Sequence, residues 1–302
     1  MRVVRTVAEL REARAGRSDV GLVPTMGAFH EGHLALMRRA REEHDFVVVS
    51  LFVNPAQFGE SADLEAYPRD EERDLELAAA EGVDLVFAPP LEEVYPDDFD
   101  TTVSVGGLTS TLEGDAGSRG PEHFAGVTTV VTKLFNMVQP DAAYFGQKDA
   151  QQALVIRKLV RDLDIPVRIE VCPTVRDPDG LALSSRNAYL TDAERELALS
   201  LSRALRAAEA TVAGGELDAA AVLAAARREL DEGGIEPEYL ELRSATDLSP
   251  VERVNGSTLL AVAARVGRAR LIDNHVFGGF PAPKHAVWGR TAAPKRKLGG
   301  RQ

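Results

Sequence analysis

The sequence has almost no cysteine, since Cys172 is the only one in 302 residues. A single thiol excludes an internal disulfide and a metal site built from several cysteines, and it fits a reducing compartment. Long apolar runs are also missing: no stretch reaches the ~18 apolar residues of a membrane span, and the first residues lack the apolar segment of a signal peptide. We therefore expect a soluble, cytoplasmic protein without a membrane partner.

Positive charge is scarce as well, with 35 Lys and Arg against 47 Asp and Glu and a formal net charge of −12. A protein that binds a nucleic-acid backbone needs a basic face, so we expect no nucleic-acid partner. An acidic protein that binds a nucleotide must place local cations against its own field. Each Lys or Arg in a loop motif is therefore of interest.

Short apolar runs alternate with helical patterns in the first part of the chain. We predict strands at 19–23, 46–53, 83–88, 142–145 and 167–171, and helices at 34–43, 69–81, 127–138 and 150–163. Continuous apolar strands that alternate with helices indicate an α/β fold, a Rossmann-like parallel sheet with helices on both faces. Ligands of such sheets bind beyond the carboxyl ends of the strands.

The pattern changes near residue 176. Helices are predicted at 192–212 and 217–232 and strands at 238–242, 258–264 and 269–273, which favours a smaller α+β C-terminal domain. From 278 the chain is rich in Gly, Pro, Lys and Arg, which predicts a disordered tail. We expect a Rossmann-like nucleotide-binding domain at 1–175, a small α+β domain at 176–277 that carries an SSRN loop, and a tail at 278–302.

Two histidines lie in the segment PTMGAFHEGH (24–33), between the first main strand and the following helix. His30 and His33 are three residues apart, so both can face one ligand, and Gly27 and Gly32 allow the backbone to approach it. A helix N-terminus favours phosphate, and imidazoles can hydrogen-bond phosphate oxygens. Turn histidines without a ligand remain an alternative. Zinc is a weaker one, because the spacing is not H-E-x-x-H and no third ligand is evident.

Three further polar segments offer ligand-binding groups. Asn54 and Gln57 follow the second main strand in FVNPAQF, Lys148 and Asp149 follow a later strand in FGQKD, and Arg186 lies in GLALSSRN. Amides suit hydroxyls and carboxylates, whereas Lys and Arg suit phosphate. Plain alternatives are an Asn-Pro turn, a surface ion pair and a helix-capping loop. Neither common glycine-rich phosphate loop is present, so these segments would have to bind a nucleotide themselves.

Together these segments resemble known families. His30-Glu-Gly-His33 resembles the HIGH signature of the nucleotidylyltransferase and class I aminoacyl-tRNA synthetase superfamily, and Leu183-Ser-Ser-Arg186 resembles its KMSKS-type loop. The order and spacing of PTMGAFHEGH, FVNPAQF, AYPRD, EHFAGV, YFGQKDAQQ, DGLALSSRN and RLIDN, from about residue 20 to 275, are similar to those of the pantothenate synthetase (pantoate–β-alanine ligase) family.

This resemblance implies a ligase of pantothenate and coenzyme A biosynthesis that condenses (R)-pantoate with β-alanine at the expense of ATP. It implies a pantoyl-adenylate intermediate, release of AMP and diphosphate, Mg²⁺ and a homodimer. His33 would be the proton donor, assisted catalytically by His30, Lys148 and Arg186. Gln57 would contact pantoate and β-alanine. The resemblance assigns ATP binding to Met26, Gly27, Ala28, Phe29, His30, Glu31, Gly32, His33, Gly146, Gln147, Lys148, Asp149, Val175, Leu183, Ser184, Ser185 and Arg186, pantoate binding also to Gln152, and a Mg²⁺-linked carboxylate to Asp74.

Two features depart from the family pattern. Gln147 stands where the family more often has Glu, and the stretch 118–123 (SRGPEH) is one residue longer than usual, which leaves the role of His123 open.

Three other functions compete with the ligase. Gln57 and Gln152 argue against an adenylyl- or cytidylyltransferase that makes a dinucleotide. A tRNA synthetase is disfavoured because the acidic chain has no plausible RNA-binding domain. The intact histidines of the first segment, with Lys148 and Arg186, argue against a catalytically silent nucleotide sensor.

Overall fold

The computed structural model describes residues 1–59, 61–114 and 119–281. Within these residues, six strands form one sheet in the order β1-β4-β3-β2-β5-β6, and every pairing is parallel. The strands are β1 Arg2–Val4, β2 Val20–Thr25, β3 Phe46–Leu51, β4 Leu85–Phe87, β5 Ala142–Gly146 and β6 Arg168–Cys172. The predicted Rossmann-like parallel sheet is confirmed.

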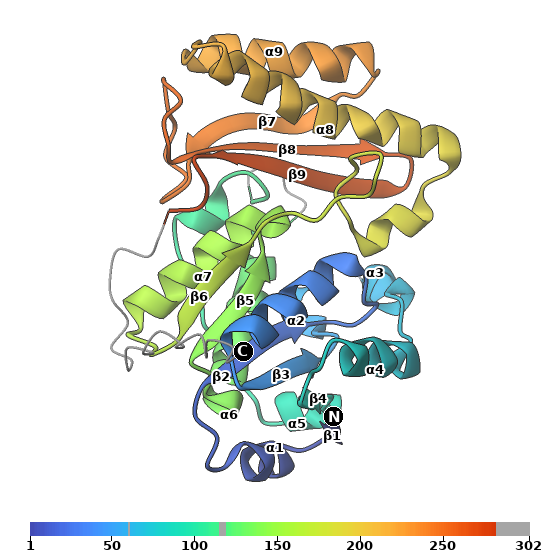
Figure 1. The fold of residues 1–302 in the computed structure, drawn as a ribbon, viewed down its shortest axis with the longest axis vertical. Helices are drawn as coiled ribbons and strands as arrows, with labels where there is room; N and C mark the ends of the chain where they lie inside the picture. The colour runs from blue at the N-terminus through green and yellow to red at the C-terminus, as the bar shows by residue number, and fades with distance from the viewer. Residues whose placement is uncertain (60, 115–118, 282–302) are drawn as a thin grey trace, which may run out of the picture.

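Helices cover both faces of this sheet (Figure 1). The α-helices are α1 Val7–Arg14, α2 Glu31–Glu43, α3 Ser61–Ala66, α4 Glu71–Ala80, α5 Leu91–Val94, α6 Pro121–Val138 and α7 Ala150–Asp162, and the 3-10 helices are η1 Pro55–Gln57, η2 Leu108–Ser110, η3 Gln147–Asp149 and η4 Ser185–Tyr189. The predicted main helices are confirmed. The short elements β1, α1, α3 and α5 were not predicted.

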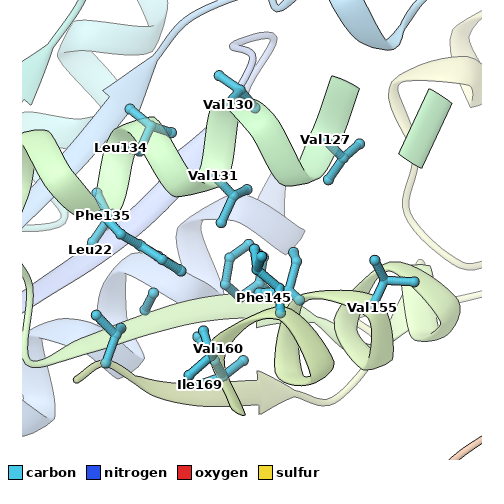
Figure 2. Close-up of a cluster of buried hydrophobic side chains, with 14 of the residues drawn as sticks. Leu22, Val127, Val130, Val131, Leu134, Phe135, Phe145, Val155, Val160 and Ile169 are labelled. Atoms are coloured by element: carbon cyan, nitrogen blue, oxygen red, sulfur yellow. The ribbon is translucent and has the colours of Figure 1, made fainter. Parts of the chain in front are cut away.

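Alternating side chains of the strands enter two different cores. On β2, Leu22 packs in a cluster with residues of α1, α6 and α7, whereas Val23 packs against α2 and α4. Because successive side chains of a strand point to opposite faces, the four inner strands β2, β3, β4 and β5 contribute to both clusters. Figure 2 shows the larger cluster, in which Val131 and Phe135 of α6 point toward β5, which carries Phe145.

A second sheet of three antiparallel strands, β7 Pro237–Ser244, β8 Thr258–Val266 and β9 Ala269–Phe277, confirms the predicted α+β C-terminal part. One face packs on α8 Asp192–Ala213 and α9 Ala219–Glu232 through residues such as Leu260 and Val262. The opposite face, through Leu259 and Ala261, joins the core of the six-stranded part. The small sheet is therefore buried on both faces and fixed against the larger one.

The first four residues of the expected tail, 278–281, pack against the fold. Residues 278–281 follow β9 directly, Phe280 packs against the large core, and the Pro281 carbonyl accepts a hydrogen bond from Arg157 of α7 at 2.8 Å. Residues 282–302, the rest of the expected tail, lie outside the described residues. No helix in the described part of the chain is long and apolar enough to cross a membrane.

Candidate active site

A cavity of about 850 Å³ lies at the carboxyl ends of β2, β3, β5 and β6, where the loops of the large sheet meet the connection to the second sheet. This is the position that a parallel α/β sheet predicts for a ligand. The residues expected at the site that line this cavity are Met26, His30, Gly32, His33, Gln57, Gly146, Lys148, Asp149, Gln152, Val175, Leu183, Ser184, Ser185 and Arg186.

The two histidines cap the start of α2 reciprocally. His30 Nδ1 accepts a hydrogen bond from the backbone N–H of Gly32 at 3.1 Å, and His33 Nδ1 accepts one from the N–H of His30 at 3.4 Å. The ring centroids are 4.1 Å apart. A neutral imidazole has one acceptor and one donor nitrogen, so the hydrogen of each ring lies on Nε2. Both histidines thus present a fixed N–H donor in the cavity.

Burial keeps both rings uncharged. Burial, together with the nearby His30 and Lys148, lowers the pKa of His33 to about 3, although Asp149 opposes them. Burial, followed by the charge of Lys148, also lowers the pKa of His30. At neutral pH the pair therefore acts on an anion through hydrogen bonds rather than through positive charge.

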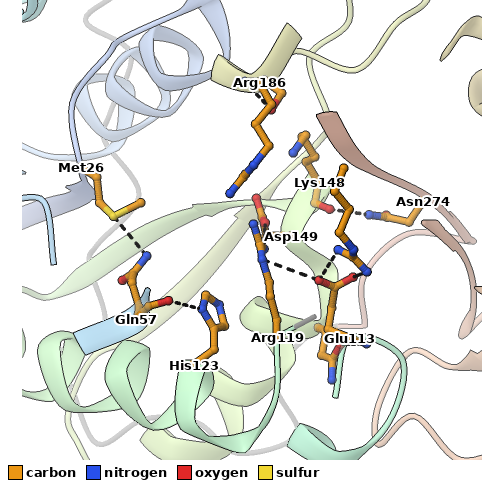
Figure 3. Close-up of polar contacts among 12 residues, drawn as sticks. Met26, Gln57, Glu113, Arg119, His123, Lys148, Asp149, Arg186 and Asn274 are labelled. Atoms are coloured by element: carbon orange, nitrogen blue, oxygen red, sulfur yellow. Dashed lines mark hydrogen bonds and ion pairs between the residues drawn. The ribbon is translucent and has the colours of Figure 1, made fainter. Parts of the chain in front are cut away.

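Positive charge comes instead from Lys148 and two arginines. Lys148 and Asp149 form η3 at the end of β5, and Arg119 lies 3.6 Å from the Asp149 carboxylate (Figure 3). Burial raises the pKa of Asp149, but the charges of Lys148, Arg119 and Arg186 outweigh it and hold that pKa below its usual value. Burial lowers the pKa of Lys148, while Asp149 opposes this. The described cavity wall carries these three cations against two carboxylates, Asp149 and Glu122, which leaves it positive and suits a phosphate chain.

The opposite end of the cavity is built from amides and an apolar wall. Asn54 is 1% exposed and donates from Nδ2 to Gln57 Oε1 at 3.0 Å, while Gln57 Nε2 lies 3.1 Å from the sulfur of Met26. Tyr95 donates to Asn54 Oδ1 at 2.8 Å. The apolar wall comes from one face of α6 and consists of Val127, Val130, Val131 and Leu134. This end suits a small molecule with hydroxyl and methyl groups.

Asp74, expected near Mg²⁺, has another role in the structure. It is 2% exposed, and its carboxylate accepts hydrogen bonds from the backbone N–H groups of Ala28 at 2.8 Å and Phe29 at 2.7 Å. Gly27 and Ala28 adopt left-handed φ values of 87° and 53°, which are costly for a non-glycine residue. Both oxygens of Asp74 hold this turn, and Asp74 does not line the cavity, so in the structure it braces the histidine loop.

Five of the residues expected to contact ATP do not line the cavity. They are Gly27, Ala28, Phe29, Glu31 and Gln147. Ala28 belongs to the braced turn, and Phe29 is 5% exposed in the core. Glu31 forms an ion pair with Arg38 on the surface of α2. Gln147 points toward the second sheet, where its Nε2 donates to Asn274. Some residues of the motifs therefore face the cavity, and others hold the loops that carry them.

Several cavity residues were not assigned from the sequence. His123 lines the cavity and bonds from Nδ1 to the carbonyl of Gln57 at 2.6 Å, and burial lowers its pKa to about 4. Tyr67 and Arg119 line it as well. The motifs AYPRD and EHFAGV contained the signal for Tyr67 and His123, but neither motif shows by itself which side chain points inward.

This fold and site define an α/β enzyme. Its polar cavity has room for an anionic ligand and, beside it, a second and smaller molecule. The particular family follows from the whole chain: the family model described as pantoate–β-alanine ligase matches residues 2–276. The chain belongs to that family. It is therefore a ligase, an enzyme that forms a C–N bond.

The matches to related proteins span almost the full length of each relative. The chain is 53% identical to the pantothenate synthetase of Roseiflexus castenholzii over 276 residues, 91% of this chain and 98% of the relative. The crystal structure of pantothenate synthetase from Thermus thermophilus has a TM-score of 0.87 and 50% identity and covers 91% and 99% of the two chains. The pantoate–β-alanine ligase of Francisella tularensis, solved with β,γ-ATP and β-alanine, has a TM-score of 0.76 and 34% identity and covers 92% and 98%.

The lowered histidine pKa values predict how stability depends on pH. Since the folded chain binds fewer protons at His33 than the unfolded chain, the free energy of unfolding falls as pH drops from about 6.5 toward 3. The slope per histidine is at most about 1.4 kcal/mol per pH unit, and less where water reaches the ring. In urea unfolding between pH 7 and pH 4.5, His33→Gln should lose less stability than wild type. Equal losses would show that His33 is not buried in its neutral form.

Proposed function

We propose that this chain catalyses the ATP-dependent condensation of (R)-pantoate with β-alanine to pantothenate, through a pantoyl-adenylate, with release of AMP and diphosphate. The observation that carries this proposal is the division of one cavity into two ends. Lys148 and Arg186 lie away from Gln57 and Met26 in Figure 3, and the charge of Lys148 acts on both histidines, so these groups form the end suited to phosphates. Gln57 lies at the end suited to a small hydroxy acid.

The pantoate end agrees with the chemistry of that molecule. Pantoate has two hydroxyl groups, a carboxylate and two methyl groups. Gln57 and Gln152 would bind its polar groups, and the apolar face of α6 would cover its methyl groups. Gln57 would also contact β-alanine, because the amine must reach the same carboxyl carbon. The Francisella tularensis relative was solved with β,γ-ATP and β-alanine, which supports the choice of these two substrates.

The reaction requires activation of a poor electrophile. A pantoate carboxylate oxygen would attack the α-phosphorus of ATP, and the bond from that phosphorus to the bridging oxygen of diphosphate would break. Lys148 and Arg186 would offset the negative charge that is redistributed on the phosphates. His30 and His33 would donate hydrogen bonds from Nε2 to the phosphate oxygens. We propose that His33 acts as a donor in this sense.

The second step forms the product. The neutral amine of β-alanine would attack the acyl carbon, the C–O bond to AMP would break, and the amine would lose a proton. The mixed anhydride reacts readily with water, so enclosure in the cavity, under the loop at 183–186, is needed until the amine arrives.

Mg²⁺ is proposed to enter together with ATP rather than to occupy a site of its own. In residues 1–59, 61–114 and 119–281, no group of three or more His, Cys, Asp or Glu side chains could hold a metal. Mg²⁺ commonly takes phosphate oxygens, waters and one or two carboxylates. Asp149 and Glu122 are the carboxylates on the described cavity wall and fit that limited role. The ion would supply positive charge for the phosphates.

We also propose a homodimer formed by the N-terminal domain, which rests on the family alone. A cytoplasmic location and a division into a domain at 1–175, a domain at 176–277 and a tail are proposed from the sequence pattern. Light scattering that shows a monomer at micromolar concentration would contradict the dimer.

The two-step order makes a direct prediction. ATP and pantoate without β-alanine should give one equivalent of diphosphate per active site and an enzyme-held adenylate, because the first step does not use the amine. Rapid-quench measurement of diphosphate with ATP and pantoate in excess over the enzyme tests this. Strict dependence of the first turnover on β-alanine would contradict the adenylate.

Lys148→Ala should lower the rate of diphosphate release by about 100-fold or more, the usual loss for one electrostatic stabiliser, ~3 kcal/mol. Lys158→Ala is the matched control, because Lys158 forms an exposed ion pair with Asp162 on α7. The control should melt and react like wild type. A Lys148→Ala enzyme that melts normally and reacts at the wild-type rate would remove Lys148 from the site.

A further inference from the structure

Asn274, on strand β9 of the small sheet, contacts the loop that carries Lys148. Its side chain is buried, and Nδ2 donates to the backbone carbonyls of Gln147 and Lys148, each at 2.9 Å. Its Oδ1 accepts a hydrogen bond from Gln147 Nε2 at 3.3 Å. Both ends of the Asn274 amide are therefore used on this one turn.

The turn depends on that contact. η3 and the start of α7 have no side-chain hydrogen bond that caps them. Asn274 does not replace such a cap, because it donates to two carbonyls of the turn instead of accepting from its N–H groups, but it ties the turn to β9 from outside. A carbonyl left without its partner in a buried place costs about 1–3 kcal/mol, so the turn would shift to find another donor.

The preceding residue, Asp273, holds the second of the two loops proposed to bind phosphate. The first phosphate loop is the Lys148 turn, Gln147–Asp149, and the second is the loop at 183–186. Asp273 is as deeply buried as Asn274, and its carboxylate accepts two hydrogen bonds from Arg176, at 2.6 and 2.9 Å. Arg176 also donates to the carbonyl of Gly180 at 3.1 Å, and it pairs with Ala182 across a tight turn. That turn leads directly into residues 183–186.

The two contacts are joined to each other. The backbone N–H of Asn274 donates to Asp273 Oδ1 at 2.8 Å, so both side chains are fixed on one short piece of strand. Asp273 and Asn274 lie on β9, and β9 is paired along its length with β8, the central strand of the small sheet. One dipeptide therefore holds two loops that approach the cavity from different parts of the chain.

We propose that Asp273 and Asn274 are positioning residues, which set Lys148 and Arg186 in their relative places across the cavity. Neither would touch the reacting atoms. This inference rests on the proposed function only for the identity of the reaction that it slows. Through Asp273 and Asn274, the second sheet would influence the rate of the first chemical step.

Removal of the contact should act on the adenylation rate more than on pantoate binding. Displacement of a charged group by about 1 Å can cost up to ~10²-fold in rate. Of the two residues proposed to bind pantoate, Gln57 is held by Asn54 on a loop that Asn274 does not contact, and Gln152 lies on α7, beyond the turn that Asn274 contacts. A residue that merely stabilised the domain interface would lower the melting temperature and leave the rate of the folded enzyme unchanged.

The test compares Asn274→Ala with Tyr239→Phe. Tyr239 also makes a buried contact between the two parts, donating to Glu113 at 2.6 Å, but it bonds to neither phosphate loop, and Glu113 keeps two bonds from Arg270. Rapid-quench diphosphate release with saturating ATP and pantoate, the pantoate KM, thermal melting and hydrogen–deuterium exchange of residues 147–152 would be measured for each.

We expect Asn274→Ala to release diphosphate at least 10-fold more slowly, with a pantoate KM within about threefold of wild type and faster exchange at 147–152. Tyr239→Phe should react within about twofold of wild type with unchanged exchange there. If the alanine variant does not fold, Asn274→Asp replaces it, since it keeps the size and the acceptor and loses both donors.

A folded Asn274 variant with a wild-type rate and wild-type exchange would overturn the proposal. So would an equal loss of rate in Tyr239→Phe. Exchange does not depend on which reaction is catalysed, so failure of the wild-type enzyme to make pantothenate would sink the proposed function without deciding the role of Asn274.

Discussion

The site depends on the parallel alignment of β3, β2 and β5 in the centre of the large sheet. Residues 20–25 pair in register with 46–51, and β5 pairs with β2 on its other side. Parallel strands end at the same edge, so the histidine loop, the Asn54–Gln57 turn and the Lys148 turn must open on one side. Hydrophobic burial on both faces fixes this alignment, and the polar groups of the cavity follow from it.

The electrostatic arrangement answers the problem of an acidic protein that binds ATP. A net charge of −12 would repel the triphosphate, but Lys148, Arg119 and Arg186 gather around a single aspartate at the cavity wall. The two histidines add hydrogen-bond donors without charge, because burial keeps them neutral. Attraction is thus confined to the place where the phosphates would lie.

Most of the fold and much of the site could be predicted from the sequence, because hydrophobic periodicity defines long elements and strand ends define the loops. β1 was missed because three residues carry too short a pattern. The role of Asp74 could not be predicted, since spacing shows that a carboxylate is near the loop but not that α4 turns it toward two backbone amides. For the same reason, RLIDN indicated the family but not the contacts of Asp273 and Asn274, which exist only after the two sheets pack together.

The central claim is that the pantoate carboxylate attacks the α-phosphorus of ATP in this cavity. It is tested most directly with pantoate labelled with ¹⁸O in both carboxylate oxygens, by mass spectrometry of the nucleotide after complete turnover with β-alanine. The account predicts one ¹⁸O atom in the phosphate of AMP and one in the amide carbonyl of pantothenate. Unlabelled AMP, or ADP together with labelled inorganic phosphate, would contradict it.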